Sequence, residues 1–213
     1  MSVLLWILLL FCIYSLYGVA NLKENVALFA RLDRIDDPNP EAEKIAYLPM
    51  AKAKRYIKSV RNLSQVRSME QFKINFDAVL NFYSPIGDEE TGKFLGNEIF
   101  GAVNNTKQPE EVSRALVDYI EPRLMKDNVR HLLLVGRMYY AMWMNFKKES
   151  DFAKSEEMFL RAHEIGPRLP NPLYGLLDLY QRKGEKEKAR ITAEEILKEW
   201  PTDKRIQGVL MQK

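Results

Sequence analysis

The chain has 213 residues, of which 46% are hydrophobic and 29% are charged, a composition that excludes a protein disordered throughout its length. It has 32 Lys and Arg against 29 Asp and Glu, so the net charge is only +3. This balance excludes the strongly basic class of nucleic-acid-binding proteins, and we expect no nucleic-acid partner.

The first predicted element is a hydrophobic helix over residues 1–22. No residue from 2 to 22 is charged, and about 20 apolar residues suffice to cross a bilayer. We interpret this segment as a retained transmembrane anchor of a single-pass membrane protein. The alternative is a signal peptide cleaved after Ala20, because Gly18-Val19-Ala20 has small residues at the spacing that signal peptidase uses, although no basic residues precede the segment.

A basic segment follows the predicted anchor. Residues 23–40 form a predicted juxtamembrane linker that ends in prolines, and residues 44–69 contain seven bases and no acid. Because Lys and Arg near a span favour the cytoplasmic side, we expect the C-terminal domain to face the cytoplasm. We also expect bases of this segment to contact anionic lipid headgroups, with a solvated helix face as the alternative. These bases are Lys52, Lys54, Arg55, Lys58 and Arg61.

The rest of the chain has helical spacing of its apolar residues and no alternating strand pattern, so the sequence predicts an all-α array. The helical pattern of residues 41–60 is expected to break at Pro49, since proline disfavours helical geometry in the residue before it. The other predicted helices span residues 69–82, 89–103, 110–120, 129–147, 152–164, 172–182, 186–200 and 204–211.

A repeat of 34 residues is present in the C-terminal third. Tyr140 and Tyr174 have this separation, as do Pro167 and Pro201. A period of this length is typical of stacked pairs of helices. We assign two repeat units to residues 136–203 and a capping helix to residues 204–213. Degenerate repeats are predicted for residues 41–135, where Tyr47, Tyr83 and Tyr119 recur every 36 residues, with chance recurrence as the alternative.

Residues 150–167 resemble the second helix of the tetratricopeptide motif, whose small residue, aromatic, alanine and proline fall on Ser155, Phe159, Ala162 and Pro167. The resemblance implies stacked helical hairpins whose first helices line a surface for a protein or peptide partner. Where the family has Leu-Gly in the first helix, this chain has Met142-Trp143 and Leu176-Leu177, so we expect those helices to lie slightly further apart. The residues expected to define the repeat are Phe146, Ser155, Phe159, Ala162, Pro167, Tyr180, Gly184, Ala189 and Pro201.

The first helices of the two units provide a predicted binding groove. Tyr and Arg are frequent anchors of interfaces. For Tyr140 and Tyr174 the alternative role is packing between the repeats. The Lys and Asn set with which some family members clamp a peptide carboxylate is not reproduced. The groove residues are Arg137, Tyr140, Met144, Lys148, Tyr174, Asp178, Gln181 and Arg182.

The order of parts also resembles the C-terminal end of bacterial O-antigen ligase or polymerase membrane proteins. It consists of a hydrophobic span, the segments 76–80 and 84–90, and then repeats. The resemblance implies either a membrane scaffold for cell-envelope polysaccharide assembly or the non-catalytic tail of a larger membrane glycan transferase. An exported soluble repeat protein, freed after Ala20, is the third alternative.

Residues for chemistry are not found in any known arrangement. The single cysteine, Cys12, excludes an intrachain disulfide and a cysteine-based zinc site. His131 and His163 lie in separate predicted helices, and we expect both to be structural. Acidic clusters lie at helix starts, where they stabilise the helix dipole, and phosphate-loop, metal and nucleophile motifs are absent. We therefore predict no catalytic residue, no metal and no cofactor, and we expect that the chain is not an enzyme.

Overall fold

The structure is a computed structural model of the chain and describes residues 40–211, with side chains over residues 47–210. The described residues form nine α-helices, with two short 3-10 helices and no strand, which confirms the all-α fold class. The predicted anchor, residues 1–22, and nearly all of the linker, residues 23–40, lie outside the described residues. Within the described part, no helix is both long and apolar enough to cross a bilayer.

The helices follow one another through short connections. They are α3 (Pro40–Asn62), α4 (Met69–Leu80), α5 (Asp88–Val103), α6 (Glu110–Ile120), α7 (Val129–Phe146), α8 (Glu149–Ile165), α9 (Pro170–Lys183), α10 (Lys186–Glu199) and α11 (Lys204–Met211). The 3-10 helices η1 (Leu63–Gln65) and η2 (Glu121–Arg123) follow α3 and α6.

The chain divides into two compact units, Met1–Leu48 and Pro49–Lys213. In the first unit only residues 40–48, the beginning of α3, are described. The expected break of the helix at Pro49 is wrong, because α3 runs through this residue. A proline removes one backbone donor, which weakens a helix, but the turns on both sides of Pro49 keep their helical conformation. The division between the two units nevertheless falls at this proline.

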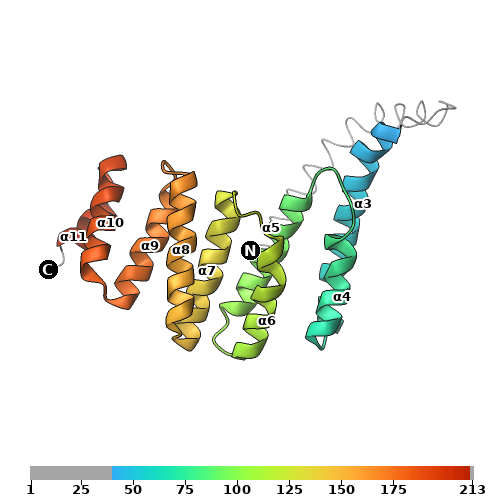
Figure 1. The fold of residues 1–213 in the computed structure, drawn as a ribbon, viewed down its shortest axis with the longest axis horizontal. Coiled ribbons are helices and arrows are strands. Elements are labelled where there is room, and N and C mark those ends of the chain that lie inside the picture. The colour runs from blue at the N-terminus through green and yellow to red at the C-terminus, as the bar shows by residue number, and fades with distance from the viewer. Residues whose placement is uncertain (1–39, 212–213) are drawn as a thin grey trace, which may run out of the picture. The chain divides into compact units, whose positions relative to one another are not determined.

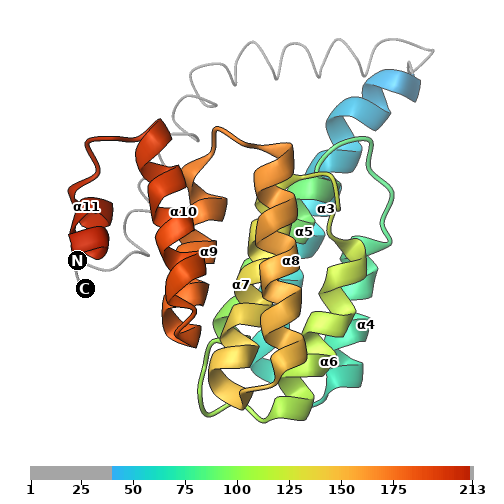
Figure 2. The same cartoon turned by 60° about the vertical axis from the view of Figure 1, so that its left-hand side comes forward.

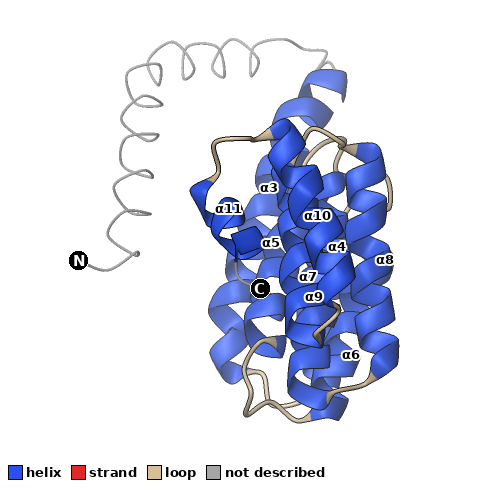
Figure 3. Cartoon of the chain, turned by 90° about the vertical axis from the view of Figure 1, so that its left-hand side faces the viewer, coloured by secondary structure: helices blue, strands red, loops and turns tan. Residues whose placement is uncertain are grey.

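Within Pro49–Lys213, successive helices form hairpins that stack side by side (Figure 1). The hairpins are α5 with α6, α7 with α8 and α9 with α10. Their first helices α5, α7 and α9 are neighbours in one layer, and α6, α8 and α10 lie in front of them in Figure 2. The connecting loops gather at the two ends of these layers (Figure 3). Hairpin α7–α8 begins at Val129, so the boundary that we placed between residues 135 and 136 falls inside a helix.

Local signals explain several helix ends. Asn128 caps the N-terminal end of α7, because its side chain accepts hydrogen bonds from the backbone N–H groups of Arg130 and His131. Gly184 caps the C-terminal end of α9. It has a φ of 84°, a left-handed conformation that glycine adopts without a Cβ clash. Lys147 takes the matching place after α7 with a φ of 57°, at the steric cost of a Cβ.

Phe159 of α8 fixes the spacing of two neighbouring hairpins. A Cβ added to Gly136 of α7 would lie 2.7 Å from ring atom Cε1 of Phe159, and a Cβ added to Gly175 of α9 would lie 3.0 Å from the same atom. Both helices therefore approach the ring at glycines. On the adjacent turn the hydroxyl of Ser155 donates a hydrogen bond of 2.9 Å to the carbonyl of Gly136. Close packing is thus provided by Gly136 and Gly175 instead of the positions where the tetratricopeptide family has its Leu-Gly pair.

The other repeat residues fall into three groups. Ala162, Tyr180 and Ala189 are buried, and Phe146 is half-buried. Pro167 and Pro201 are exposed in the turns that follow α8 and α10. The predicted capping helix is α11, whose Ile206 is buried against the last hairpin, and residues 212–213 lie outside the described part.

The buried side chains form two clusters that meet at the α7–α8 hairpin. The larger cluster is built on α4 to α8 and contains Phe76 and Met138. The smaller one is built on α7 to α11 and contains Trp143, Phe159 and Leu179. Near the α7–α8 turn, the ring of Trp143 packs edge-on against Phe152 at a centroid distance of 5.3 Å, so large side chains fill the space between the helices there.

Candidate protein-docking surface

Three of the predicted groove residues lie together on the exposed sides of α7 and α9. The hydroxyl of Tyr140 on α7 donates a hydrogen bond of 2.5 Å to Oδ2 of Asp178 on α9. Arg182 lies one turn further along α9, with Nε 3.6 Å from Oδ1 of Asp178. The Tyr140–Asp178 hydrogen bond joins the two helices at the surface, while the Arg182–Asp178 pair lies within α9.

A second Tyr–Asp contact is found one repeat later. The hydroxyl of Tyr174 on α9 donates to Oδ2 of Asp203, just before α11, and the guanidinium of Arg205 lies 5.3 Å from the centre of the Tyr174 ring. The spacing of 34 residues between Tyr140 and Tyr174 therefore has a structural counterpart. Tyr140 binds a carboxylate on α9, and Tyr174 binds a carboxylate that lies just before α11. We call these two Tyr–Asp contacts the tyrosine ladder.

Both ladder tyrosines remain protonated at neutral pH. Burial raises the pKa of Tyr140 above its usual range, and the hydrogen bond to Asp178 raises it further. For Tyr174 the hydrogen bond to Asp203 is the larger cause of the raised pKa. A protonated phenol can donate only one hydrogen bond, so each hydroxyl proton is already used within the fold. The two hydroxyls are therefore engaged within the fold, which agrees with the packing alternative, and the groove role of these tyrosines stays a prediction.

The surface continues from α7 onto α5. The guanidinium of Arg137 on α7 lies 4.2 Å from the centre of the Phe100 ring on α5. On the exposed side of α5, Phe94 remains 51% exposed although its ring also approaches Tyr56 of α3. Helices α5, α7 and α9 are neighbours in one layer, and we call their exposed sides together the inner-helix face.

The remaining predicted groove residues are less closely grouped. Met144 is half-buried against the smaller hydrophobic cluster, and Gln181 is exposed on α9. Lys148 lies in the turn between α7 and α8, where it forms an ion pair with Glu110 of α6. Its ammonium group therefore contacts the second layer and not the ladder.

The predicted lipid-contacting bases also differ from one another in their surroundings. Lys52 is only 2% exposed. Its Nζ donates a hydrogen bond of 2.8 Å to the carbonyl of Phe82 and forms an ion pair with Asp88. This burial corrects our prediction that Lys52 contacts lipid. Arg55 is exposed but stacks over the ring of Phe82 at 4.4 Å.

In the layer formed by α6, α8 and α10, an ion pair joins two neighbouring hairpins. Arg114 of α6 donates to both carboxylate oxygens of the buried Asp151 of α8, at 3.0 and 2.9 Å. Glu110 accepts a further bond from Arg114 at 2.6 Å. The two-pronged geometry matches a carboxylate to a guanidinium, and both hydrogen-bonding carboxylates raise the pKa of Arg114.

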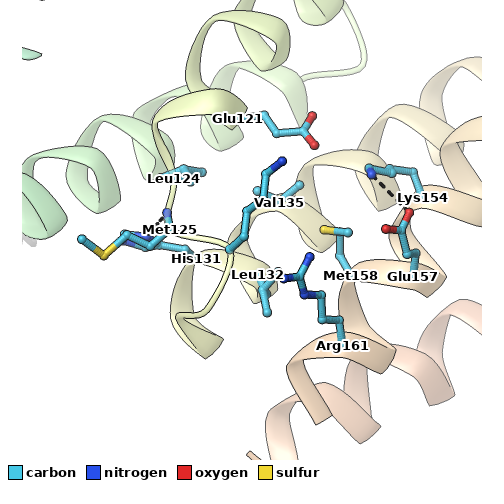
Figure 4. A pocket seen from close by; sticks show the side chains of 11 residues that line it. Glu121, Leu124, Met125, His131, Leu132, Val135, Lys154, Glu157, Met158 and Arg161 are labelled. Atoms are coloured by element: carbon cyan, nitrogen blue, oxygen red, sulfur yellow. Dashed lines mark hydrogen bonds and ion pairs between the residues drawn. The ribbon is translucent and has the colours of Figure 1, made fainter. Parts of the chain in front are cut away.

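A small pocket of about 90 Å³ opens between η2, the start of α7 and α8 (Figure 4). Glu121 and Arg161 lie on opposite sides of it in Figure 4. Glu121 accepts the hydroxyl of Tyr139 at 2.6 Å. Lys154 pairs with Glu157 at 3.1 Å. Of the charged residues that line the pocket, Lys154 and Glu157 thus pair with each other, and Glu121 is held by a tyrosine hydroxyl.

The two histidines are held in structural contacts. Nδ1 of His131 accepts the backbone N–H of Met125 at 2.9 Å, so the proton of the neutral ring lies on Nε2. Nε2 of His163 on α8 lies 3.1 Å from Oε1 of Glu195 on α10. Among the described residues, no carboxylate pairs with His131, and no group of three or more His, Cys, Asp or Glu side chains lies close enough to hold a metal ion.

Comparison with known proteins found no matching family model, no matching curated protein and no matching solved structure. The resemblances to tetratricopeptide repeats and to O-antigen ligases therefore stay predictions drawn from this chain's own residues.

Sequence reasoning missed Phe94 and both glycines that contact Phe159. A signal for Phe94 was present, because it is an aromatic residue between Glu90 and Asn97 on the polar side of a predicted helix. The glycines gave no such signal, because their importance depends on a ring that belongs to another helix.

Proposed function

We propose that the chain is a membrane-anchored scaffold of tetratricopeptide-like repeats that binds a protein partner on the inner-helix face. The observation that supports the proposal best is the neighbouring arrangement of α5, α7 and α9, with Phe94 half exposed on α5. Partly exposed aromatic side chains are frequent anchors at protein interfaces. Residues 1–22 supply the proposed membrane anchor, and the bases that follow them favour a cytoplasmic position for the repeats.

The chemistry of the face favours a partner segment with an apolar anchor and charges of both signs. Phe94 and Met144 supply apolar surface. Arg137 and Arg182 are exposed cations, and Asp178 is an exposed anion. Because the tyrosine ladder fixes these helices before binding, the partner would not have to order the surface.

Photo-crosslinking in the native host tests the face directly. A photoreactive phenylalanine analogue is placed at Phe94 or at Gln181 on the inner-helix face, and at Lys198 on α10 as the control. We expect the same covalent adduct from both face positions and none from Lys198. Equal adducts from all three positions, or none from Phe94 and Gln181, would refute the proposed docking face.

The order of parts supports a second candidate function, a non-catalytic tail of a membrane glycan transferase active in the cell envelope. Intact mass of the native protein from membrane and soluble fractions separates the alternatives. A membrane species of 24.9 kDa supports the anchored scaffold. A much larger membrane species supports the transferase tail. A soluble species smaller by about 2 kDa, the size of a signal peptide, identifies an exported protein.

A further inference from the structure

The part of α3 that follows Pro49 is attached to the repeats by one side only. The buried Lys52 binds the connection between α4 and α5 through the carbonyl of Phe82. The hydroxyl of Ser59 donates to the carbonyl of Asn75 on α4 at 2.7 Å. The ring of Tyr56 lies between these residues and packs near Phe76, with a centroid distance of 6.4 Å. These residues define the inner side of α3.

The opposite side of α3 carries a stripe of exposed apolar and basic residues. Met50 and Ile57 are 45% and 42% exposed. Lys54, Lys58 and Arg61 are exposed, and none of the three forms an ion pair or side-chain hydrogen bond within the described part of the chain. The five residues follow one another at helical spacing, so they share one face of the helix. We call them the α3 stripe.

We propose that the α3 stripe lies on an anionic membrane surface. Met50 and Ile57 give the stripe an apolar component that a purely polar helix face lacks. At a membrane, such side chains enter the headgroup region while neighbouring bases meet lipid phosphates. No acid interrupts residues 44–69, so nothing in the segment opposes the attraction. The inference rests on the proposed anchor, because residues 1–22 precede α3 and would hold it close to the bilayer.

The contact would also orient the repeats. Because Lys52 and Ser59 fasten the inner side of α3 to α4 and to the α4–α5 connection, a membrane on the outer side of α3 faces away from the hairpins. The inner-helix face is then presented by a scaffold whose first helix is fixed to the bilayer at two points, the anchor and the stripe.

A fluorescent label on α3 tests the proposal in the full chain. Cys12→Ser removes the native thiol, and Ala53→Cys, at the exposed edge of the stripe, takes an environment-sensitive dye. The protein is added to vesicles of phosphatidylcholine alone, or of two parts phosphatidylcholine to one part phosphatidylglycerol. Flotation of the vesicles reports the anchor, and the dye emission reports whether α3 touches lipid.

We expect a blue-shifted, stronger emission only with phosphatidylglycerol, and its reversal by high salt. The triple variant Lys54→Glu, Lys58→Glu and Arg61→Glu should lower the ratio of lipid-bound to free α3 by roughly a hundredfold, since each base contributes about fivefold. The matched control Lys107→Glu, Arg168→Glu and Lys198→Glu changes the net charge equally and should keep the shift. Circular dichroism confirms that each variant is folded.

Three results would overturn the lipid contact alone. One is flotation without any lipid-dependent change of emission, which leaves the anchor intact. The second is equal emission from the triple variant and the control. The third is a shift caused by polyglutamate but not by vesicles, which would assign the α3 stripe to an acidic protein. Failure of every variant to float with either lipid would overturn the anchor together with the lipid contact.

Discussion

Replacing Gly136 with alanine adds one methyl group where α7 meets the ring of Phe159. The new Cβ would lie 2.7 and 2.9 Å from ring atoms Cε1 and Cδ1, so the ring or the helix must move. Overpacking of this kind costs about 1–3 kcal/mol, while alanine gains about 1 kcal/mol over glycine inside a helix. We therefore expect Gly136→Ala to lower the free energy of unfolding by about 1 kcal/mol.

A double-mutant cycle shows whether the ring is the cause. Phe159→Leu removes the ring atoms that the new methyl group would meet, so Gly136→Ala should cost much less in its presence. We expect an interaction energy of about 1 kcal/mol or more between the two sites. The measurement is urea unfolding of all four proteins, followed by circular dichroism.

Gly101→Ala is the matched control, because no atom lies within 4 Å of a Cβ added to Gly101 on α5. It should be neutral or raise the free energy of unfolding by up to about 1 kcal/mol. If Gly136→Ala stabilises the protein as much as Gly101→Ala does, the close contact between α7 and Phe159 is refuted.

Three further predictions concern polar contacts. Tyr140→Phe deletes the hydroxyl bound to Asp178 and should lower the free energy of unfolding by about 1 kcal/mol; an unchanged urea midpoint would show that the ladder contributes nothing. Arg114→Met leaves the buried carboxylate of Asp151 unpaired and should cost about 3 kcal/mol, and adding Asp151→Leu should recover part of this loss in thermal melts. Burial, and secondarily Glu98, raises the pKa of Tyr56 from 10.0 to about 12, so its stabilising contribution is complete below pH 10 and is lost as the pH rises toward 12. Phenolate absorbance of the wild type and of Tyr56→Phe should reveal this titration, and ionisation of Tyr56 at its usual pH would contradict it.

Local signals in the sequence were sufficient for most of the fold. The predicted helices at 110–120 and 204–211 have the same ends in the structure, because Pro109 precedes the first and Asp203 caps the second. Helix α8 starts at Glu149, earlier than predicted, since residues 149–151 complete its first turn. The prediction at Pro49 failed because a rule about one residue does not weigh the stability of the turns on both sides.

The rest depended on contacts between distant residues. Lys52 belongs to a run of bases that reads as solvated surface, yet it is buried by Phe82 and Asp88, which lie 30 and 36 residues further along the chain. For the candidate site, the residues that we selected from the repeat include Tyr140, Asp178 and Arg182, and these lie together on two helices. The spacing could not tell that the tyrosine hydroxyls were already bound within the fold.

The position of Phe159 between two hairpins bears on how the protein is made. Helices α9 to α11 emerge from the ribosome last, and their buried residues, including Leu179 and Ile196, share a cluster with Phe159. The last hairpin therefore docks on apolar surface that α7 and α8 supply. We expect it to fold onto this surface once it has left the ribosome.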